Sequence, residues 1–308
     1  MANKIEILTL SKNIDNELYK TISSVIKSAR NLNKFQLQSI TYYIIIKNYS
    51  ISNKSIIISD LLNNSDLNFK IIPQDSISDI KHKKFKTNGW YEGVYDALSI
   101  VNPNSYLWFL NAGDYALESS LRKILINLKK INDKDLVGLS FLTKIIDNDF
   151  SFLKPDIYFE KESNIYILSM LPCFQAVLIK AKFLNDFKEL IYKGIEGIEM
   201  EIMGNYFKQN LFCFIPECIA IFSYGGTSTT QDIGTKKRLL NIYNFLMYKR
   251  TIKLISEIFK FIINILKISF IKRYFIFITR FRSLVTIKVF PIFKKLKLEF
   301  LYIKVDSI

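Results

Sequence analysis

The sequence predicts an α/β fold in which a mostly parallel, Rossmann-like sheet is covered by helices on both faces. Strand-like and helix-like segments alternate along the first 230 residues, and the strand-like segments are almost continuously apolar. The 308-residue chain is long enough for one large domain with an appendage. Ligands of such sheets bind at the carboxyl ends of the strands, so candidate site residues are expected there.

The first predicted unit is a buried strand over residues 5–10 (IEILTL), followed by a helix that starts near Asp15. The helix is expected because apolar residues recur at helical spacing and form one face. That face consists of Leu18, Ile22, Val25 and Ile26. Further strands are predicted over 40–46, 68–72, 105–110, 136–144, 174–179 and 211–222. Further helices are predicted over 90–101, 118–130, 181–192 and 197–208.

Residues 231–308 differ in composition from residues 1–230. They hold 17 Lys and Arg residues against 4 Asp and Glu residues, a net charge of +13, whereas the first 230 residues hold 26 against 24. Within this segment, residues 253–268 place charged and polar side chains on one stripe and Ile, Leu and Phe elsewhere, which predicts an amphipathic helix. We therefore expect a first domain over 1–230 and a basic tail of amphipathic helices over 231–308.

Three roles fit this basic tail. A basic amphipathic helix suits the interface of an anionic membrane, and this interpretation is favoured. The helix could instead pack on the first domain or on a second subunit. Nucleic acid is disfavoured as a partner, because the aromatic residues alternate with Ile and Leu and form no polar platform. No uncharged run reaches the roughly 18 residues that a transmembrane span requires.

Composition restricts the chemistry of the chain. His82 is the only histidine and lies within a lysine-rich run, which excludes a histidine triad and a multi-histidine metal site. Cys173, Cys213 and Cys218 have neither a metal-site spacing nor a disulfide framework, which favours a reducing compartment. The N-terminus lacks the pattern of a signal peptide. Acid–base chemistry is therefore expected from carboxylates.

The strand at 105–110 leads into the sequence Asn111-Ala112-Gly113-Asp114. Carboxylate and amide oxygens at a strand end can hold a hard divalent cation, which would neutralise a diphosphate leaving group. Gly113 allows the backbone to approach a ligand closely. The same residue types are common in turns, so a plain strand-to-turn connection also fits.

Four other motifs occur in a fixed order around this one. They are GVYDALS at 93–99, PCFQ at 172–175, EME at 199–201 and GGTS at 225–228. The series resembles family 2 bacterial glycosyltransferases, which build O-antigen, capsular polysaccharide and exopolysaccharide. The corresponding motifs in that family read GIYDAMN, FLNAGD or FLDADD, PHQ, DYE and GGxS. The resemblance covers residues 4–230.

This resemblance implies a GT-A fold, a nucleotide-diphosphate-sugar donor, a divalent metal ion (Mn²⁺ or Mg²⁺) and usually inversion at the anomeric carbon. It places Asn111 and Asp114 at the metal. Glu199 takes the position of the candidate general base, which would deprotonate the acceptor hydroxyl. The implied donor-binding residues are Ser11, Lys47, Asp96, Asn111 and Gly113. The implied acceptor-side loop contains Gly225, Gly226 and Ser228.

The chain departs from the family pattern at several polar positions. Lys47 stands where the family has the Asp that contacts the nucleotide base, and Phe174 replaces the His of PHQ. Tyr91 replaces an acidic residue, and Asn111 replaces the usual metal aspartate. An active enzyme would hold its donor differently, with Lys47 on a phosphate. The alternative is a catalytically inactive GT-A domain that binds a glycan or recruits a partner enzyme.

The favoured interpretation is a peripheral glycosyltransferase on the inner face of the cytoplasmic membrane. Its acceptor would be a surface glycan or a lipid-linked saccharide, and the basic tail would hold it on anionic lipid. A nucleotidyltransferase fits less well, because the sequence lacks a glycine-rich, Lys- or Arg-bearing N-terminal loop that would hold a triphosphate.

Overall fold

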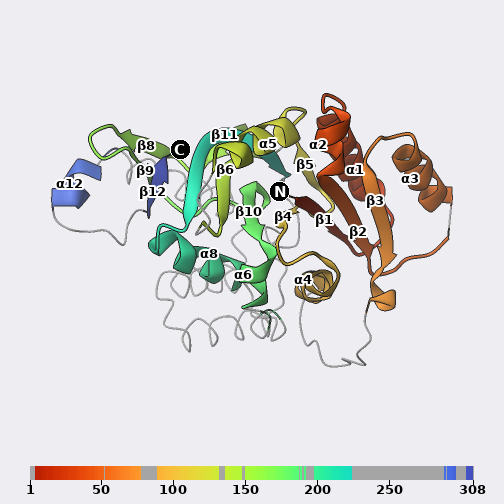
Figure 1. Cartoon of the computed structure of the whole chain (residues 1–308). Coiled ribbons are helices and arrows are strands. Elements are labelled where there is room, and N and C mark those ends of the chain that lie inside the picture. The colour runs from red at the N-terminus through yellow and green to blue at the C-terminus, as the bar shows by residue number, and fades with distance from the viewer. Residues whose placement is uncertain are drawn as a thin grey trace, which may run out of the picture.

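The described strands form one twelve-stranded mixed sheet with helices on both faces (Figure 1). The computed structural model describes residues 4–51, 53–77, 89–131, 136–147, 150–186, 188, 191, 198–223, 288, 290–295 and 303–307. The predicted α/β fold is confirmed, with a mixed sheet that lies between two helical layers.

Four parallel strands form one half of the sheet. In spatial order they are β3 (Asn68–Pro73), β2 (Ile40–Ile46), β1 (Ile5–Ser11) and β4 (Tyr106–Phe109). Residues 5–10 of β1 are all buried, as expected for a strand that is covered on both faces. Since β1, β2 and β4 run in the same direction, their carboxyl ends meet at one edge of the sheet.

The other half of the sheet begins with a strand of opposite direction. β10 (Val177–Lys180) lies antiparallel to both β4 and β6 (Gly138–Asp147), and thereby joins the two halves. β11 (Phe212–Ser223) pairs in parallel with β6 and antiparallel with the short β5 (Asp114–Ala116). The remaining strands are β7 (Phe150–Lys154), β8 (Ile157–Glu160), β9 (Ile165–Leu168) and β12 (Ile303–Ser307).

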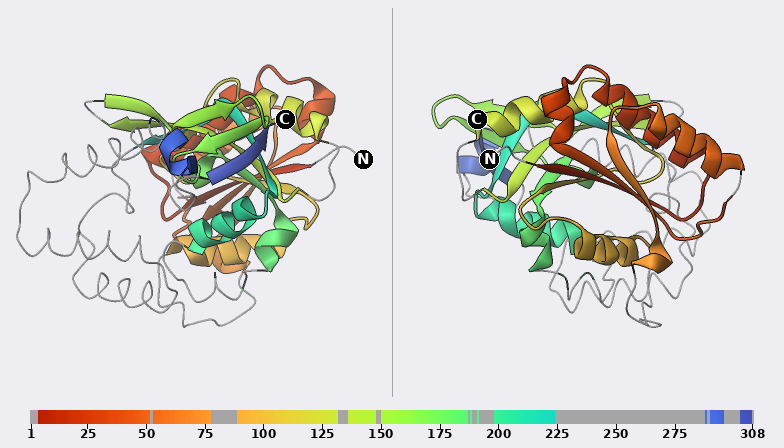
Figure 2. Two further views of the ribbon diagram at one scale, coloured as in Figure 1. Left: turned by 90° about the vertical axis from the view of Figure 1, so that its left-hand side faces the viewer. Right: turned by 45° about the vertical axis from the view of Figure 1, so that its right-hand side comes forward.

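The helices lie in two layers, one on each face of the sheet (Figure 2). The first layer contains α1 (Asn16–Ala29), α2 (Lys34–Gln38), α3 (Asn53–Asn63) and α5 (Ser120–Lys130). The second contains α4 (Gly89–Ile100), α6 (Ala181–Asn185) and α8 (Ile198–Lys208). A further short helix, α12, spans Phe290–Lys295. Each layer buries its apolar residues against its own face of the sheet, which gives two hydrophobic cores.

The predicted helix near Asp15 is α1, and its N-terminus forms as the sequence indicates. Asp15 Oδ1 accepts a hydrogen bond from Leu18 N at 2.9 Å, which satisfies one of the unpaired donors of the first turn. The predicted apolar face of this helix is buried. The strand predicted at 174–179 is shorter than expected, because residues 174–176 form a 3₁₀ turn before β10.

The predicted tail over 231–308 lies largely outside the described residues, and so does its amphipathic segment 253–268. Its described residues include β12, which pairs with β11 and β9 and lies in the sheet rather than in a helix. In the described part of the chain, no helix combines the length and the apolar character needed to cross a bilayer.

The contact between β6 and β10 depends on a glycine. A Cβ atom on Gly138 would overlap the carbonyl oxygen of Leu178 and approach the ring of Phe212 to 2.8 Å. We expect Gly138→Ala to reduce the free energy of unfolding by about 2 kcal/mol or more, because backbone must move to admit the methyl group. Urea denaturation of the purified protein measures this change.

A matched control is available in α8. A Cβ atom on Gly204 would meet only Leu171 Cδ1, at 3.7 Å, which is ordinary contact. Alanine also favours helix over glycine, so Gly204→Ala is expected to be neutral or to stabilise by up to about 1 kcal/mol. Equal destabilisation by the two substitutions would contradict this account of the β6–β10 contact.

Candidate functional site

The carboxyl ends of β1, β2 and β4 gather several predicted site residues at one edge of the sheet. Lys47 N donates to Ser11 O at 3.0 Å, which holds the end of β2 beside the end of β1. Ala112 N donates to Leu10 O at 3.2 Å, which holds the connection after β4 on the other side of β1. Ser11, Lys47 and the Asn111–Asp114 turn are therefore neighbours, as the topology predicts.

The turn between β4 and β5 is fastened to α1 by hydroxyl groups. Gly113 has a φ of +99°, a conformation that favours glycine, and its N–H donates to Thr21 Oγ1 at 3.0 Å. Ala116 N donates to Ser24 Oγ at 3.0 Å. Thr21 Oγ1 also lies 3.4 Å from Asn111 O. Two hydroxyls on one helix face thus fix both ends of the turn.

Asp114 lies in the interior behind this turn, with 5% of its surface exposed. Its Oδ2 accepts hydrogen bonds from Asn111 N and from Gln175 Nε2, both at 3.2 Å. Burial raises the pKa of this carboxyl to about 7, and the two hydrogen bonds oppose the rise. Because both bonds go to Oδ2, Oδ1 has no partner among the described residues.

Gln175 links Asp114 to the centre of the sheet. Its backbone oxygen accepts a hydrogen bond of 2.7 Å from Trp108 Nε1, and Trp108 is fully buried in β4. The neighbouring Phe174 is partly buried and packs its ring 5.1 Å from that of Phe109. Gln175 was not predicted as a site residue, although it belongs to the PCFQ motif of the ordered series. The place of that motif in the ordered series was the available signal.

Lys47 forms an ion pair with Glu92, which was not among the predicted site residues. Its Nζ lies 2.6 Å from Glu92 Oε2, so the end of β2 is joined to α4. The side chains are 42% and 26% exposed, so the pair contributes about 1 kcal/mol or less to stability. It also supplies a donor and an acceptor side by side at the edge of the site. A phosphate on Lys47 would have to share this amine with Glu92.

Asp96 lies within α4 and is held by Gln74, which was also not predicted as a site residue. Gln74 Nε2 donates to Asp96 Oδ2 at 2.9 Å. Gln74 is buried in the 3₁₀ turn that directly follows β3. The bond therefore connects the end of a third parallel strand to the carboxylate that was predicted near the donor.

The remaining predicted site residues are described in part or not at all. Glu199 is the second residue of α8, and its side chain lies outside the described atoms. Gly225, Gly226 and Ser228 also lie outside the described residues. The strand that precedes them, β11, pairs Phe222 with Asp114.

The turn has a small set of side chains that could hold a metal ion. In the part of the chain that the structure describes, no three His, Cys, Asp or Glu side chains form a metal-binding group. The turn itself supplies one carboxylate, on Asp114, and one amide, on Asn111. This set suits a hard cation that takes its other ligands from phosphate oxygens and water, as Mg²⁺ commonly does.

The raised pKa of Asp114 makes folding stability fall as pH rises. Between the ordinary value of 3.8 and the native value of about 7, the native carboxyl holds a proton that the unfolded chain has lost. We expect this residue to lower the free energy of unfolding across that range by up to about 4 kcal/mol, with no further fall above it. The metal-free protein unfolded in urea at pH 4.5, 6.0, 7.5 and 8.5 gives the curve.

The matched variant is Asp114→Asn, which keeps an acceptor for Asn111 N and Gln175 but does not titrate. Its free energy of unfolding should rise relative to that of the original chain as pH increases from 4.5 to 7.5. Parallel curves for the two proteins would show that Asp114 does not titrate as described.

Comparison with solved structures identifies the fold. No family model and no curated protein matches the chain. The mannosyltransferase PcManGT from Pyrobaculum calidifontis, in complex with GDP-Man and Mn²⁺, aligns at a TM-score of 0.50 with 7% identity, over 81% of this chain and 65% of its own. S. aureus TarS 1–349 aligns at 0.49 with 13% identity, over 79% and 65%. The chain spans 65% of the length of either neighbour. The likeness to PcManGT, together with the mixed sheet between two helical layers, shows the GT-A fold.

Proposed function

We propose that this protein is a glycosyltransferase that moves a sugar from a nucleotide-diphosphate sugar to a surface-glycan or lipid-linked acceptor. The observation that carries the proposal is the turn from Asn111 to Asp114, fixed beside Ser11 and Lys47 at the carboxyl edge of a GT-A sheet. This is the edge at which α/β sheets bind ligands. PcManGT, which shares the fold, was solved with GDP-Man and Mn²⁺.

The proposed donor lies across the ends of β2, β1 and β4. Its diphosphate would face the Asn111–Asp114 turn, where Gly113 presents backbone without a side chain. Its nucleoside would lie toward Ser11, the Lys47–Glu92 pair and Asp96. A lysine beside a carboxylate presents one hydrogen-bond donor and one acceptor, and uracil, guanine and cytosine each carry a complementary acceptor and donor on one edge. This arrangement therefore fits a nucleobase without selecting among these three.

A divalent cation, Mn²⁺ or Mg²⁺, would bind between the turn and the diphosphate of the donor. Asp114 Oδ1 and the side-chain oxygen of Asn111 would hold it. When bound, the cation would neutralise the charge of the departing diphosphate. Its positive charge would also favour the ionised form of Asp114, whose pKa burial raises to about 7.

The proposed acid–base residue is Glu199, near the start of α8. It would remove the proton of the acceptor hydroxyl as that oxygen attacks the anomeric carbon, which gives inversion in a single displacement. Gly225, Gly226 and Ser228 would border the acceptor. The order of the EME and GGTS motifs along the chain supports these two assignments.

Nucleotide binding tests the proposal. Calorimetry with UDP, GDP and CDP is expected to show affinity for at least one of them that depends on Mn²⁺. Asn111→Asp places a carboxylate where the chain has a neutral amide, so it should tighten Mn²⁺-dependent binding by about tenfold. Asp114→Asn should weaken it by at least as much while the turn stays closed.

The alternative function predicts a different result. A catalytically inactive GT-A domain that binds a glycan or recruits a partner enzyme is favoured by the replacement of polar family residues by Lys47, Tyr91 and Phe174. Absence of binding to all three nucleotides, with and without Mn²⁺, would support that alternative. Metal-dependent binding followed by hydrolysis of a nucleotide sugar would exclude it.

We also propose that the basic tail holds the enzyme on the inner face of the cytoplasmic membrane. The net charge of +13 over residues 231–308 supports this location, since each lysine or arginine near an anionic surface contributes about 1 kcal/mol. Truncation is a poor test, because β12 lies within residues 231–308 and belongs to the sheet. Charge replacement within 253–268 leaves β12 in place.

The triple variant Lys253→Gln, Lys260→Gln and Lys267→Gln should bind anionic vesicles at least tenfold more weakly than the original chain. Flotation with vesicles of phosphatidylglycerol and phosphatidylcholine, compared with phosphatidylcholine alone, measures the effect. Equal flotation of both proteins, or equal flotation with both lipids, would refute the proposed role of the tail.

A further inference from the structure

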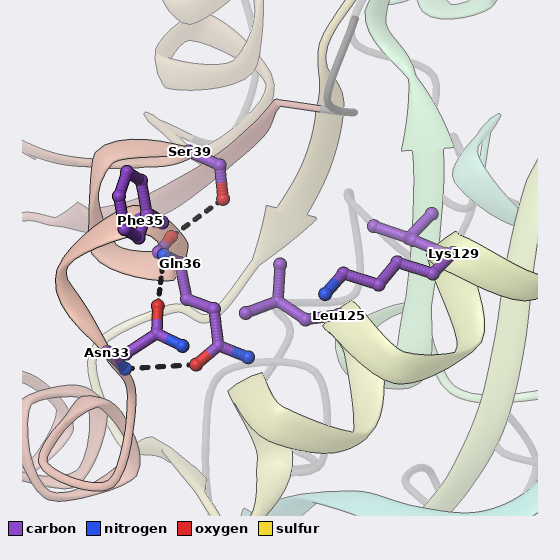
Figure 3. Close-up of a pocket in the computed structure, with 7 residues that line it drawn as sticks. Asn33, Phe35, Gln36, Ser39, Leu125 and Lys129 are labelled. Carbon is purple, nitrogen blue, oxygen red and sulfur yellow. Dashed lines mark hydrogen bonds between the residues drawn. The ribbon is translucent and has the colours of Figure 1, made fainter.

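A hollow of about 290 Å³ lies between α2 and α5, at the opposite edge of the sheet from the proposed donor site (Figure 3). α2 directly precedes β2, and Ser39 at its end accepts a hydrogen bond from Ile5 N, at the start of β1. The hollow therefore lies at the amino ends of the strands whose carboxyl ends form the site. Its lining residues are Asn33, Phe35, Gln36, Ser39, Leu125, Leu128 and Lys129.

Two side-chain amides in this hollow are fixed in orientation. Asn33 Oδ1 accepts from Gln36 N, and Gln36 Oε1 accepts from Asn33 N, both at 3.0 Å. Each amide thus spends its oxygen on the backbone, which sets the direction of its nitrogen. Neither Asn33 Nδ2 nor Gln36 Nε2 has an acceptor among the described residues. The two amide nitrogens are therefore hydrogen-bond donors of fixed direction. Their side chains would lose little further conformational freedom when a ligand binds.

The other side of the hollow adds a cation. The Lys129 side chain extends from α5 toward α2 (Figure 3). Lys129 forms no ion pair with a described residue, and no carboxylate lines the hollow. The same two helices and the end of α1 carry further exposed basic residues. They are Lys27, Arg30, Lys34 and Lys130.

An aromatic ring stands beside these donors. Phe35 is 83% exposed, the largest exposure of any aromatic side chain in the described part of the chain. The floor of the hollow is apolar, since Leu125 and Leu128 are 6% and 2% exposed. An exposed ring costs free energy in water and offers a flat apolar face to a ligand. The hollow thus combines amide donors, one ammonium group and a ring.

We propose that this hollow binds an anionic sugar unit of a glycan chain. The ring of Phe35 would pack against the apolar face of the sugar, and the amides of Asn33 and Gln36 would donate to its hydroxyls. Lys129 would pair with a carboxylate or phosphate on the sugar. The volume is at the lower end of the roughly 300–1,000 Å³ of small-molecule sites, which suits one sugar ring.

The concave shape favours a glycan over a membrane surface as the partner. The oriented donors converge inside the hollow, where a flat bilayer would leave them unused. In relation to the proposed function, the hollow would give the enzyme a second hold on a long acceptor chain. Two linked contacts raise the effective concentration of the acceptor at the other edge. That role rests on the proposed transferase activity, whereas binding itself does not.

The test uses the full chain without nucleotide or metal. Calorimetry compares a hyaluronan hexasaccharide, which carries glucuronate, with the neutral chitohexaose. We expect measurable binding of the anionic probe and at least about fivefold weaker binding of the neutral one. Phe35→Ala should weaken binding of hyaluronan by about tenfold, and Lys129→Gln should abolish the preference for the anionic probe.

The matched control is Lys182→Gln, the same charge change on α6 in the other helical layer, which should leave both affinities unchanged. Phe35 and Lys129 are exposed, so their variants should keep the original unfolding midpoint and the original affinity for nucleotide with Mn²⁺. No binding of hyaluronan, or equal binding of both probes, overturns the proposal. Lys129-dependent binding to phosphatidylglycerol vesicles without hyaluronan binding also overturns it, in favour of a membrane surface. Hyaluronan binding without nucleotide binding would uphold this site and refute the proposed transferase.

Discussion

The buried carboxylate of Asp114 is the contact on which the arrangement of the proposed site depends. It closes the turn after β4 through Asn111 N, and it holds Gln175 at the entrance to β10. Through the pairing of β5 with β11, the same residue touches the second half of the sheet. The site edge is therefore fixed by one acid that three segments share. Its high pKa is the energetic cost of placing a carboxylate where these segments meet.

The structural role of Asp114 and its proposed role as a metal ligand require different protonation states. A structural role favours a protonated or fully hydrogen-bonded carboxyl, whereas a metal ligand must be ionised. A cation would resolve the conflict by stabilising the charge that burial penalises. On this account, the apo protein is least stable at the pH values where the proposed donor complex forms best. Binding of donor and metal would then stabilise the fold as well as supply chemistry.

The sequence did not predict α3, between β2 and β3, but it predicted the four parallel strands from their apolar segments and α1 and α4 from the helical spacing of apolar residues. The helix beginning at Asp15 is the clearest case, since its cap and its apolar face are both local signals. β8 was not predicted, because its four residues alternate weakly and remain partly exposed. The partners Glu92 and Gln74 were missed for another reason. Each meets its site residue only through tertiary contact, 45 and 22 residues away along the chain.

The pairing of β12 with β11 changes what the basic tail can do mechanically. β11 ends at Ser223 and β12 begins at Ile303, and both strands belong to the same sheet. The chain between these two strands therefore leaves the sheet and returns to it. Bringing together the ends of a segment of this length costs about 4 kcal/mol of chain entropy, which the β12 pairing must offset. If this segment binds a membrane as proposed, both of its ends lead into the sheet, and the double connection would restrict how the proposed site is oriented toward the bilayer.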